Sequence, residues 1–281
     1  MASAALARPE TFRIGRGLSE SFAIIGRNLP LCGLLVFIFD VLPSAAFSLG
    51  SLALHEERVS EASSQIKILG LAEAVSHLAL AGMLQIAVAS MVMADTKRRR
   101  PTLRDCIAAA GRWMVSGTAV WLMANAALLT SWAIYWRAAV NYFQSPGHIH
   151  LPLANWILTA GAVAAAIPGL ALGARWFVAA PVLERERQGI LKSLGRSRDL
   201  TKGSRWSLVM FWLLTFGVLF WMTTISRHWM LPFGVSFRVL FNPLANVADS
   251  FVKAVVMAVS YVELLRIKEG GAVEDVAEIF S

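Results

Sequence analysis

The sequence predicts an all-α, polytopic membrane protein with six transmembrane helices and cytoplasmic amphipathic helices at the membrane surface. Hydrophobic residues make up 57% of the 281 residues, charged residues only 16%, and the mean hydropathy is +0.59. A soluble domain has roughly 45–50% apolar and about 25% charged residues, so this composition favours lipid as the solvent. The two cysteines form no CxxC pair and no disulfide framework, which excludes a cysteine-based metal site.

Six segments are long enough to cross a bilayer, which takes about 20 apolar residues. They are 29–54, 68–94, 113–136, 151–174, 206–226 and 239–262. The third, fourth and fifth segments contain no charged residue. The other three are interrupted by Asp40, by Glu73, and by Asp249 together with Lys253.

Lysine and arginine fall mainly on one side of these spans. Of the 26, 20 lie in the N-terminal arm, in 95–112, in 175–205 and after Val262, whereas the alternate loops hold five. Basic loops stay in the cytoplasm, so we expect both termini there. A single membrane domain is predicted, with a cytoplasmic arm (1–28), a six-span bundle (29–262) and a cytoplasmic tail (263–281). This asymmetry accounts for the net charge of +8, so nucleic acid is not expected as a partner.

Two of the basic segments share an apolar stripe with the spacing i, i+4, i+7, i+11, which marks one face of a helix. The stripes are Leu18, Phe22, Ile25, Leu29 and Leu103, Ile107, Ala110, Met114. A similar stripe begins at Ile190 and Leu194 before the fifth span. The pattern predicts three repeats of about 90 residues, each an interfacial helix followed by a membrane hairpin. Chance recurrence of Gly-Arg beside an apolar run is the alternative.

The segment RSRDLTKGSRW (196–206) joins the fourth and fifth spans. Its charge suits a cytoplasmic loop or an anionic lipid surface, but neither explains its spacing. We expect a helix that ends near Thr201 or Lys202, with Gly203 in the left-handed position after it and Trp206 anchoring the next span. The candidate lipid-headgroup or structural residues are Arg175, Glu184, Arg196, Ser197, Thr201, Lys202, Gly203, Arg205 and Trp206.

From about residue 170 onward the chain resembles the bacterial membrane-domain family named after glycerophosphoryl diester phosphodiesterase. The resemblance is carried by Arg175, Pro181, Glu184, Arg196, Ser197, Leu200, Thr201, Gly203, Trp206, Tyr261 and Arg266. It implies about six spans, an arginine that enters a turn containing the proline and the glutamate, and an inner-membrane location. Some family members carry a soluble phosphodiesterase domain, but that barrel needs about 250 residues, so no activity is carried over.

Charges inside the spans are the other candidate functional residues, because each costs at least about 2.5–3.5 kcal/mol near the bilayer centre. Asp249 and Lys253 are one helical turn apart and are predicted to pair. Asp40 has no local partner and is expected to face Lys253, a polar cavity or Asn125. A transport pathway and a buried structural pair both remain open.

No GxSxG, HExxH or glycine-rich phosphate loop is found, and no cofactor or metal is expected. His148 and His150 have no acid or cysteine nearby, which favours a turn over a metal site. We therefore expect a non-enzymatic inner-membrane protein that organises anionic lipids or partner proteins at the cytoplasmic leaflet. The alternative is a small transporter or lipid-moving protein that uses Asp40, Asp249 and Lys253.

Overall fold

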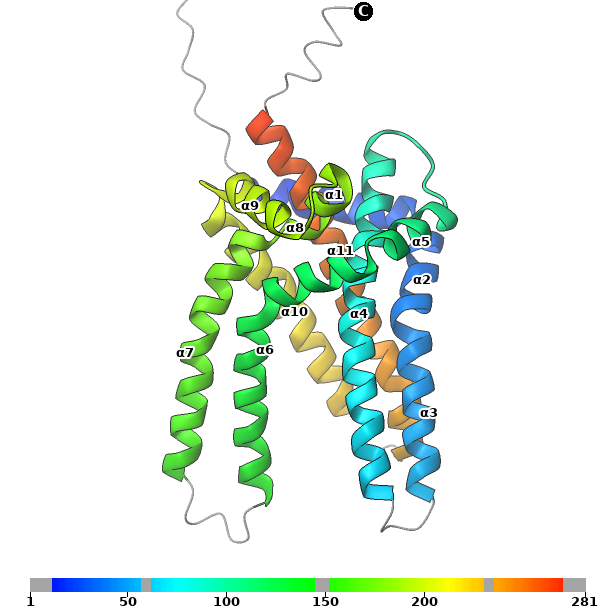
Figure 1. The fold of residues 1–281 in the computed structure, drawn as a ribbon, viewed down its shortest axis with the longest axis vertical. Helices are drawn as coiled ribbons and strands as arrows, with labels where there is room; N and C mark the ends of the chain where they lie inside the picture. The colour runs from blue at the N-terminus through cyan, green and yellow to red at the C-terminus, as the bar shows by residue number, and fades with distance from the viewer. Residues whose placement is uncertain (1–11, 57–61, 145–151, 230–234, 270–281) are drawn as a thin grey trace, which may run out of the picture.

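The computed structural model describes residues 12–56, 62–144, 152–229 and 235–269, and all regular structure in these ranges is helical. The predicted all-α class is therefore confirmed. Long helices run along one axis, and short helices lie across one end of the bundle (Figure 1). We call this the interfacial end. The first and the last described helices both reach it (Figure 1).

In the described residues, six helical segments run along the long axis of the bundle. The first consists of two α-helices joined by a π-helical turn, η1 (Phe37–Val41). The six segments are α2 (Leu29–Val36) with η1 and α3 (Leu42–Glu56), then α4 (Ala62–Thr96), α6 (Met114–Gln144), α7 (Pro152–Trp176), α10 (Arg205–Trp229) and α11 (Val235–Glu269). The short helices at the interfacial end are α1 (Ile14–Arg27), α5 (Leu103–Arg112), α8 (Ala179–Glu186) and α9 (Ile190–Thr201).

Five stretches of the described chain are long and apolar enough to cross a membrane. They are Leu29–Gly50, Leu71–Thr96, Met114–Ser131, Ala160–Glu186 and Arg205–Ser226. Large apolar side chains are exposed along them, among them Phe37, Val163 and Trp221. Such exposure is unfavourable in water and is compatible with a multi-pass membrane protein. The sixth predicted span, 239–262, falls on α11, where the side chains of 238–249 lie outside the described residues.

The short helices are held by small residues that let them approach the bundle. Gly17, Ser21 and Ile24 are the buried residues of α1, whereas Phe22 on the predicted stripe is 65% exposed. In α5 the buried residues are Cys106, Ala109 and Ala110, and Ile107 is exposed. The predicted stripes are therefore divided between core and surface. Ala110 is buried, and Leu18, Ile25 and Leu103 pack against the core, whereas the other four stripe residues are exposed, namely Phe22, Leu29, Ile107 and Met114.

One of our expectations at the interfacial end was wrong in detail. The segment with Pro181 and Glu184, expected as a turn, forms helix α8, whose residues 179–183 are all buried. The chain turns only afterwards, at Arg187, which has a positive φ of 53°. Helix α11 also continues past Val262 to Glu269, so the first part of the predicted tail belongs to the bundle.

Helices α4 and α6 cross closely at two glycines, Gly82 of α4 and Gly117 of α6. A Cβ built on Gly82 would lie 2.9 Å from both the Cα and the backbone nitrogen of Thr118. On the other side, a Cβ on Gly117 would meet the Ile86 side chain at 2.3 Å. Glycines at such crossings allow the backbones to approach closely, which is how membrane helices gain packing contacts in lipid.

We expect Gly82→Ala to lower the melting temperature of the detergent-purified protein. Its new Cβ meets backbone atoms, which cannot rotate away, so α4 and α6 must separate at a cost of about 1–3 kcal/mol. Gly161→Ala in α7 is the control, because a Cβ there meets nothing within 4 Å and alanine favours a helix. Equal melting temperatures for the two variants would contradict the close crossing.

Candidate functional site

Ser197 and Thr201 of the basic segment form hydrogen bonds to the end of α7. The Ser197 hydroxyl donates a hydrogen bond of 3.1 Å to the carbonyl oxygen of Arg175. The Thr201 hydroxyl lies 3.3 Å from the same oxygen and shares its one hydrogen with the carbonyl of Arg198 at 3.2 Å. Both hydroxyl-bearing side chains are fully buried. The last carbonyls of a helix lack intrahelical partners, so this pair, one turn apart on α9, satisfies one of them. We call this arrangement the clasp.

Arg196 joins three helices at the same place. Its Nε lies 3.1 Å from Glu186 Oε1 on α8, and its guanidinium also pairs with Glu269 at the end of α11. The Tyr261 hydroxyl donates a hydrogen bond of 3.4 Å to Glu186. Burial tends to lower the pKa of Arg196, but the bonds to Glu186 and Glu269 outweigh it and raise the pKa above its usual range. The Arg196 charge is thus engaged within the protein.

The rest of the basic segment forms the predicted turn. Helix α9 ends at Thr201, Lys202 is its extended C-cap, and Gly203 follows with a φ of 93°. Only glycine adopts this left-handed conformation without a steric penalty. Trp206 then begins the next span with 80% of its surface exposed. Both the helix end and the left-handed glycine were predicted correctly.

Arg175 and Glu184 contribute in different ways. The Arg175 side chain is exposed, and its role in the clasp is that of its backbone carbonyl. Glu184 is half-buried near the charges of Arg187, Arg112 and Lys97. Within the described chain no hydrogen bond or ion pair joins these two side chains. Arg205 has a buried Nε that finds no partner among the described residues.

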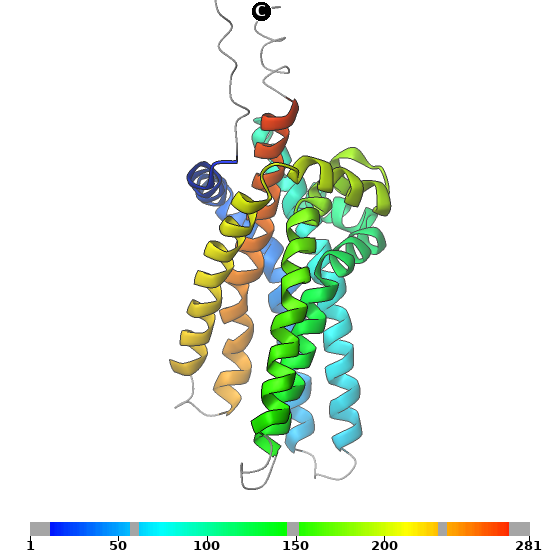
Figure 2. The same cartoon turned by 90° about the vertical axis from the view of Figure 1, so that its left-hand side faces the viewer.

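A second charged cluster, which sequence reasoning missed, ties α1 to α11. Glu263 is only 1% exposed and accepts hydrogen bonds from Arg16 at 3.1 Å and from Arg266 at 3.2 Å. Arg266 also reaches Glu20 on α1 at 3.4 Å. In the turned view, α1 and α9 lie on opposite sides of the end of α11 (Figure 2). The signal in the sequence was an acidic residue directly after the last apolar run.

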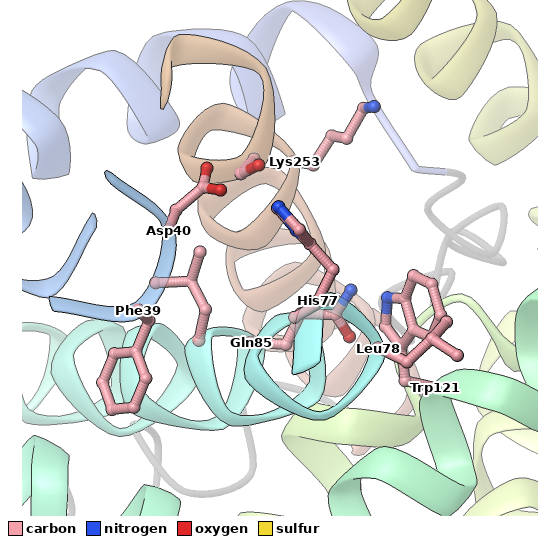
Figure 3. Close-up of a pocket in the computed structure, with 10 residues that line it drawn as sticks. Phe39, Asp40, His77, Leu78, Gln85, Trp121 and Lys253 are labelled. Atoms are coloured by element: carbon pink, nitrogen blue, oxygen red, sulfur yellow. The ribbon is translucent and has the colours of Figure 1, made fainter. Parts of the chain in front are cut away.

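A cavity of about 260 Å³ with both polar and apolar walls lies between the helices, and Asp40 and Lys253 both line it. His77, Gln85, Trp121 and Ser250 contribute to its walls. Figure 3 shows the Asp40 carboxylate and the His77 ring pointing toward the same space beside α11. The sequence therefore identified two residues of this site, although they are more than 200 positions apart.

Asp40 is the most unusual residue of this cavity. It is 5% exposed, and its Oδ2 is buried with no hydrogen-bond partner among the described residues. It lies on η1, just before Pro43, which has no N–H to donate to the carbonyl of Phe39 and so favours a wider turn. Such π-helical turns are frequent at functional sites.

The other polar groups of the cavity have contacts of their own. His77 Nε2 lies 2.9 Å from the Ser44 hydroxyl, and the Lys253 ammonium lies 5.1 Å from the centre of the Phe216 ring. Asn125 lines a separate, smaller cavity with Trp121. The Asp249 side chain lies outside the described residues, so its predicted pair with Lys253 is untested.

The described residues contain no group of three or more His, Cys, Asp or Glu side chains placed to bind a metal. His148 and His150 lie outside that part of the chain. Burial raises the pKa of the Cys106 thiol to about 11, so this cysteine is protonated and unreactive near neutral pH. Comparisons with protein families, with curated proteins and with solved structures give no match.

We expect the double variant Ser197→Ala, Thr201→Val to lose about 1–3 kcal/mol of stability, because the part-buried Arg175 carbonyl loses the hydroxyls that bond to it. The measurement is thermal unfolding in detergent. Ser19→Ala, Thr130→Val removes two exposed hydroxyls that bond only within their own helices, and it is the matched control. A double variant as stable as this control would show that the clasp contributes nothing.

Proposed function

We propose that this chain is a six-span integral inner-membrane protein that binds and organises anionic lipids, and through them partner proteins, at the cytoplasmic leaflet. Its interfacial end would face the cytoplasm, as the distribution of lysine and arginine indicates. The sixth span would be formed by α11, whose 35 residues exceed the length that a bilayer requires.

One observation carries this proposal. Interfacial helices α1, α5 and α9 each expose a large apolar side chain, Phe22, Ile107 and Leu191 respectively, in a segment rich in arginine and lysine. Apolar side chains enter the acyl region while basic ones meet anionic headgroups, so such helices suit the plane of the interface. Trp206 and Leu29, also exposed, extend this apolar surface onto the first turns of two spans.

The three-repeat architecture is part of the proposal, and one geometric likeness supports it. Helices α1 and α5 both end in Gly-Arg, and the next residues, Asn28 and Trp113, adopt nearly the same backbone angles, −116° and 20° against −109° and 17°. In both cases a span begins directly afterwards. The third unit differs, because two short helices, α8 and α9, take the place of one.

A non-enzymatic role is proposed because several charged side chains of the interfacial end bridge helices. Arg196 does so in the cluster around Glu186, and Arg16 in the cluster around Glu263. Membership of the glycerophosphoryl diester phosphodiesterase membrane-domain family is proposed as well. The clasp supports it by giving physical roles to Arg175, Ser197, Thr201 and Gly203, which carry the resemblance. No phosphodiesterase activity is included in this proposal.

Native mass spectrometry of the gently extracted protein tests the lipid role. We expect phosphatidylglycerol or cardiolipin to be retained in excess of its share of the membrane, because each lysine or arginine near an anionic leaflet contributes on the order of 1 kcal/mol. Retention should weaken as salt is raised, since exposed charges are screened within about 10 Å at 0.1 M. Bound lipids in bulk membrane proportions at every salt concentration would refute the proposal.

A second candidate function, lipid movement or small-molecule transport through the bundle, is favoured by the unpartnered Oδ2 of Asp40 beside the cavity. A carboxylate in the apolar part of a membrane is costly and usually has a function. The cavity, at about 260 Å³, has room for a small solute.

Asp40→Asn tests this second candidate. In liposomes with a fluorescent phospholipid, the wild-type protein would speed the exposure of inner-leaflet lipid to an external reducing quencher, and the variant would lose that activity. Its melting temperature should stay equal or rise, because an uncharged amide replaces a carboxyl group whose buried Oδ2 has no hydrogen-bond partner among the described residues. Ser76→Ala, which removes an exposed hydroxyl on α4, is the control. Wild-type liposomes as slow as empty ones would exclude lipid movement.

A further inference from the structure

A groove of about 530 Å³ opens at the interfacial end, between the junction of α1 and α2 and the end of α4. We call it the Arg groove. Four arginines line it, together with one carboxylate and one amide: Arg27, Arg98, Arg99, Arg100, Asp95 and Asn28. In the sequence these arginines stand out only as part of the charge asymmetry.

The end of α4 brings three of the arginines together. Helix α4 ends at Thr96, and Arg98 adopts a left-handed conformation with a φ of 54°. The Arg98 and Arg99 amides then donate to the carbonyls of Asp95 and Ala94, at 2.9 Å and 3.0 Å, which closes the helix end. Pro101 favours an extended Arg100. The three consecutive arginines therefore follow a turn at the end of α4 and do not extend the helix.

The single carboxylate of the groove is already engaged. Asp95 Oδ2 accepts a hydrogen bond of 2.6 Å from Arg27, and its Oδ1 accepts one of 2.9 Å from Asn28. These bonds hold Arg27 at the groove, while 59% of its side chain stays exposed. Arg98, Arg99 and Arg100 are exposed and form no ion pair with a described residue. One negative charge therefore faces four positive ones.

This arrangement differs from that of the basic segment singled out in the sequence. Arg196 lies between Glu186 and Glu269, so its charge is balanced inside the protein. In the Arg groove the excess of positive charge is open to solvent at the level where α2 begins. Leu29, the first residue of α2, is exposed next to Asn28 and offers an apolar path down the same helix.

We propose that the Arg groove is a binding site for a phosphate group, carried by the headgroup of an anionic phospholipid or by free phosphate. Guanidinium groups bind phosphate oxygens through paired N–H donors, and several of them together favour a dianionic or clustered ligand. The volume lies within the range of about 300–1,000 Å³ of small-ligand sites. The lipid form of this inference rests on the proposed function and gives it a location.

The test replaces the three exposed arginines in the full-length protein, as Arg98→Gln, Arg99→Gln, Arg100→Gln. A control with the same loss of charge replaces exposed residues of the interfacial end outside α1, α5 and α9: Arg185→Gln, Arg187→Gln, Lys268→Gln. Binding of phosphatidylglycerol is measured by native mass spectrometry during titration. Each arginine contributes roughly a factor of five near an anionic surface, so the groove variant should bind on the order of a hundredfold more weakly. The control should retain most of the wild-type affinity.

A second arm distinguishes the sources of the phosphate. Inorganic phosphate is added to delipidated protein, and the melting temperature is followed. Stabilisation of the wild type and the control, but not of the groove variant, assigns the site to free phosphate. Stabilisation by phosphatidylglycerol alone assigns it to lipid.

Equal weakening of the groove variant and the control would overturn the site while leaving the proposed lipid-binding function intact. Wild-type protein that binds neither phosphatidylglycerol nor inorganic phosphate would overturn both. Unchanged melting temperatures of the ligand-free variants show that they are folded, which is expected because all six replaced side chains are exposed.

Discussion

At Glu263 a nearly fully buried carboxylate holds Arg16 of α1 and Arg266 of α11, and the arrangement of the interfacial end depends on interactions of this kind. A buried charge without a partner costs several kcal/mol, so these arginines must stay where the carboxylate is. The same reasoning applies to Glu186, which holds Arg196 and Tyr261. Both clusters fasten short surface helices to the end of α11, and α11 in turn packs into the core of the bundle.

Arginine has two distinct roles at this end of the molecule. Arg16 and Arg196 face carboxylates and join helices, so replacing them would unbalance a buried or half-buried acid. Arg98, Arg99 and Arg100 face solvent and leave a positive charge open at the interfacial end. The composition of the chain does not separate these roles, because both kinds of arginine lie in segments that the positive-inside rule would place in the cytoplasm. The two roles differ in whether a carboxylate lies next to the arginine: Arg16 and Arg196 have one, at Glu263 and Glu186.

The cavity inside the bundle follows a different physical rule. Apolar helices pack closely through Gly82 and Gly117, yet the turn at Asp40 leaves a space beside them. Helix α2 would continue without interruption if its hydrogen-bond ladder were complete, but Pro43 removes a donor from it. The π-helical turn and the buried Asp40 therefore belong to one short sequence. They form the basis of the second candidate function, whereas the first rests on the helices of the interfacial end.

The sequence alone determined the helical class, the apolar stretches and the left-handed turn at Gly203, and it singled out Asp40 and Lys253, which line one cavity. These follow from local periodicity, from the special backbone of glycine, and from the cost of charge in an apolar span. Only the tertiary structure decided the partners of Arg196, the burial of Glu263 and the Arg groove, and it replaced an expected turn with α8. Arg16 and Glu263 are 247 positions apart, and no local pattern specifies which acid meets which base across that distance. The folded bundle specifies it, because it brings several helix ends to one face where their charges must be balanced.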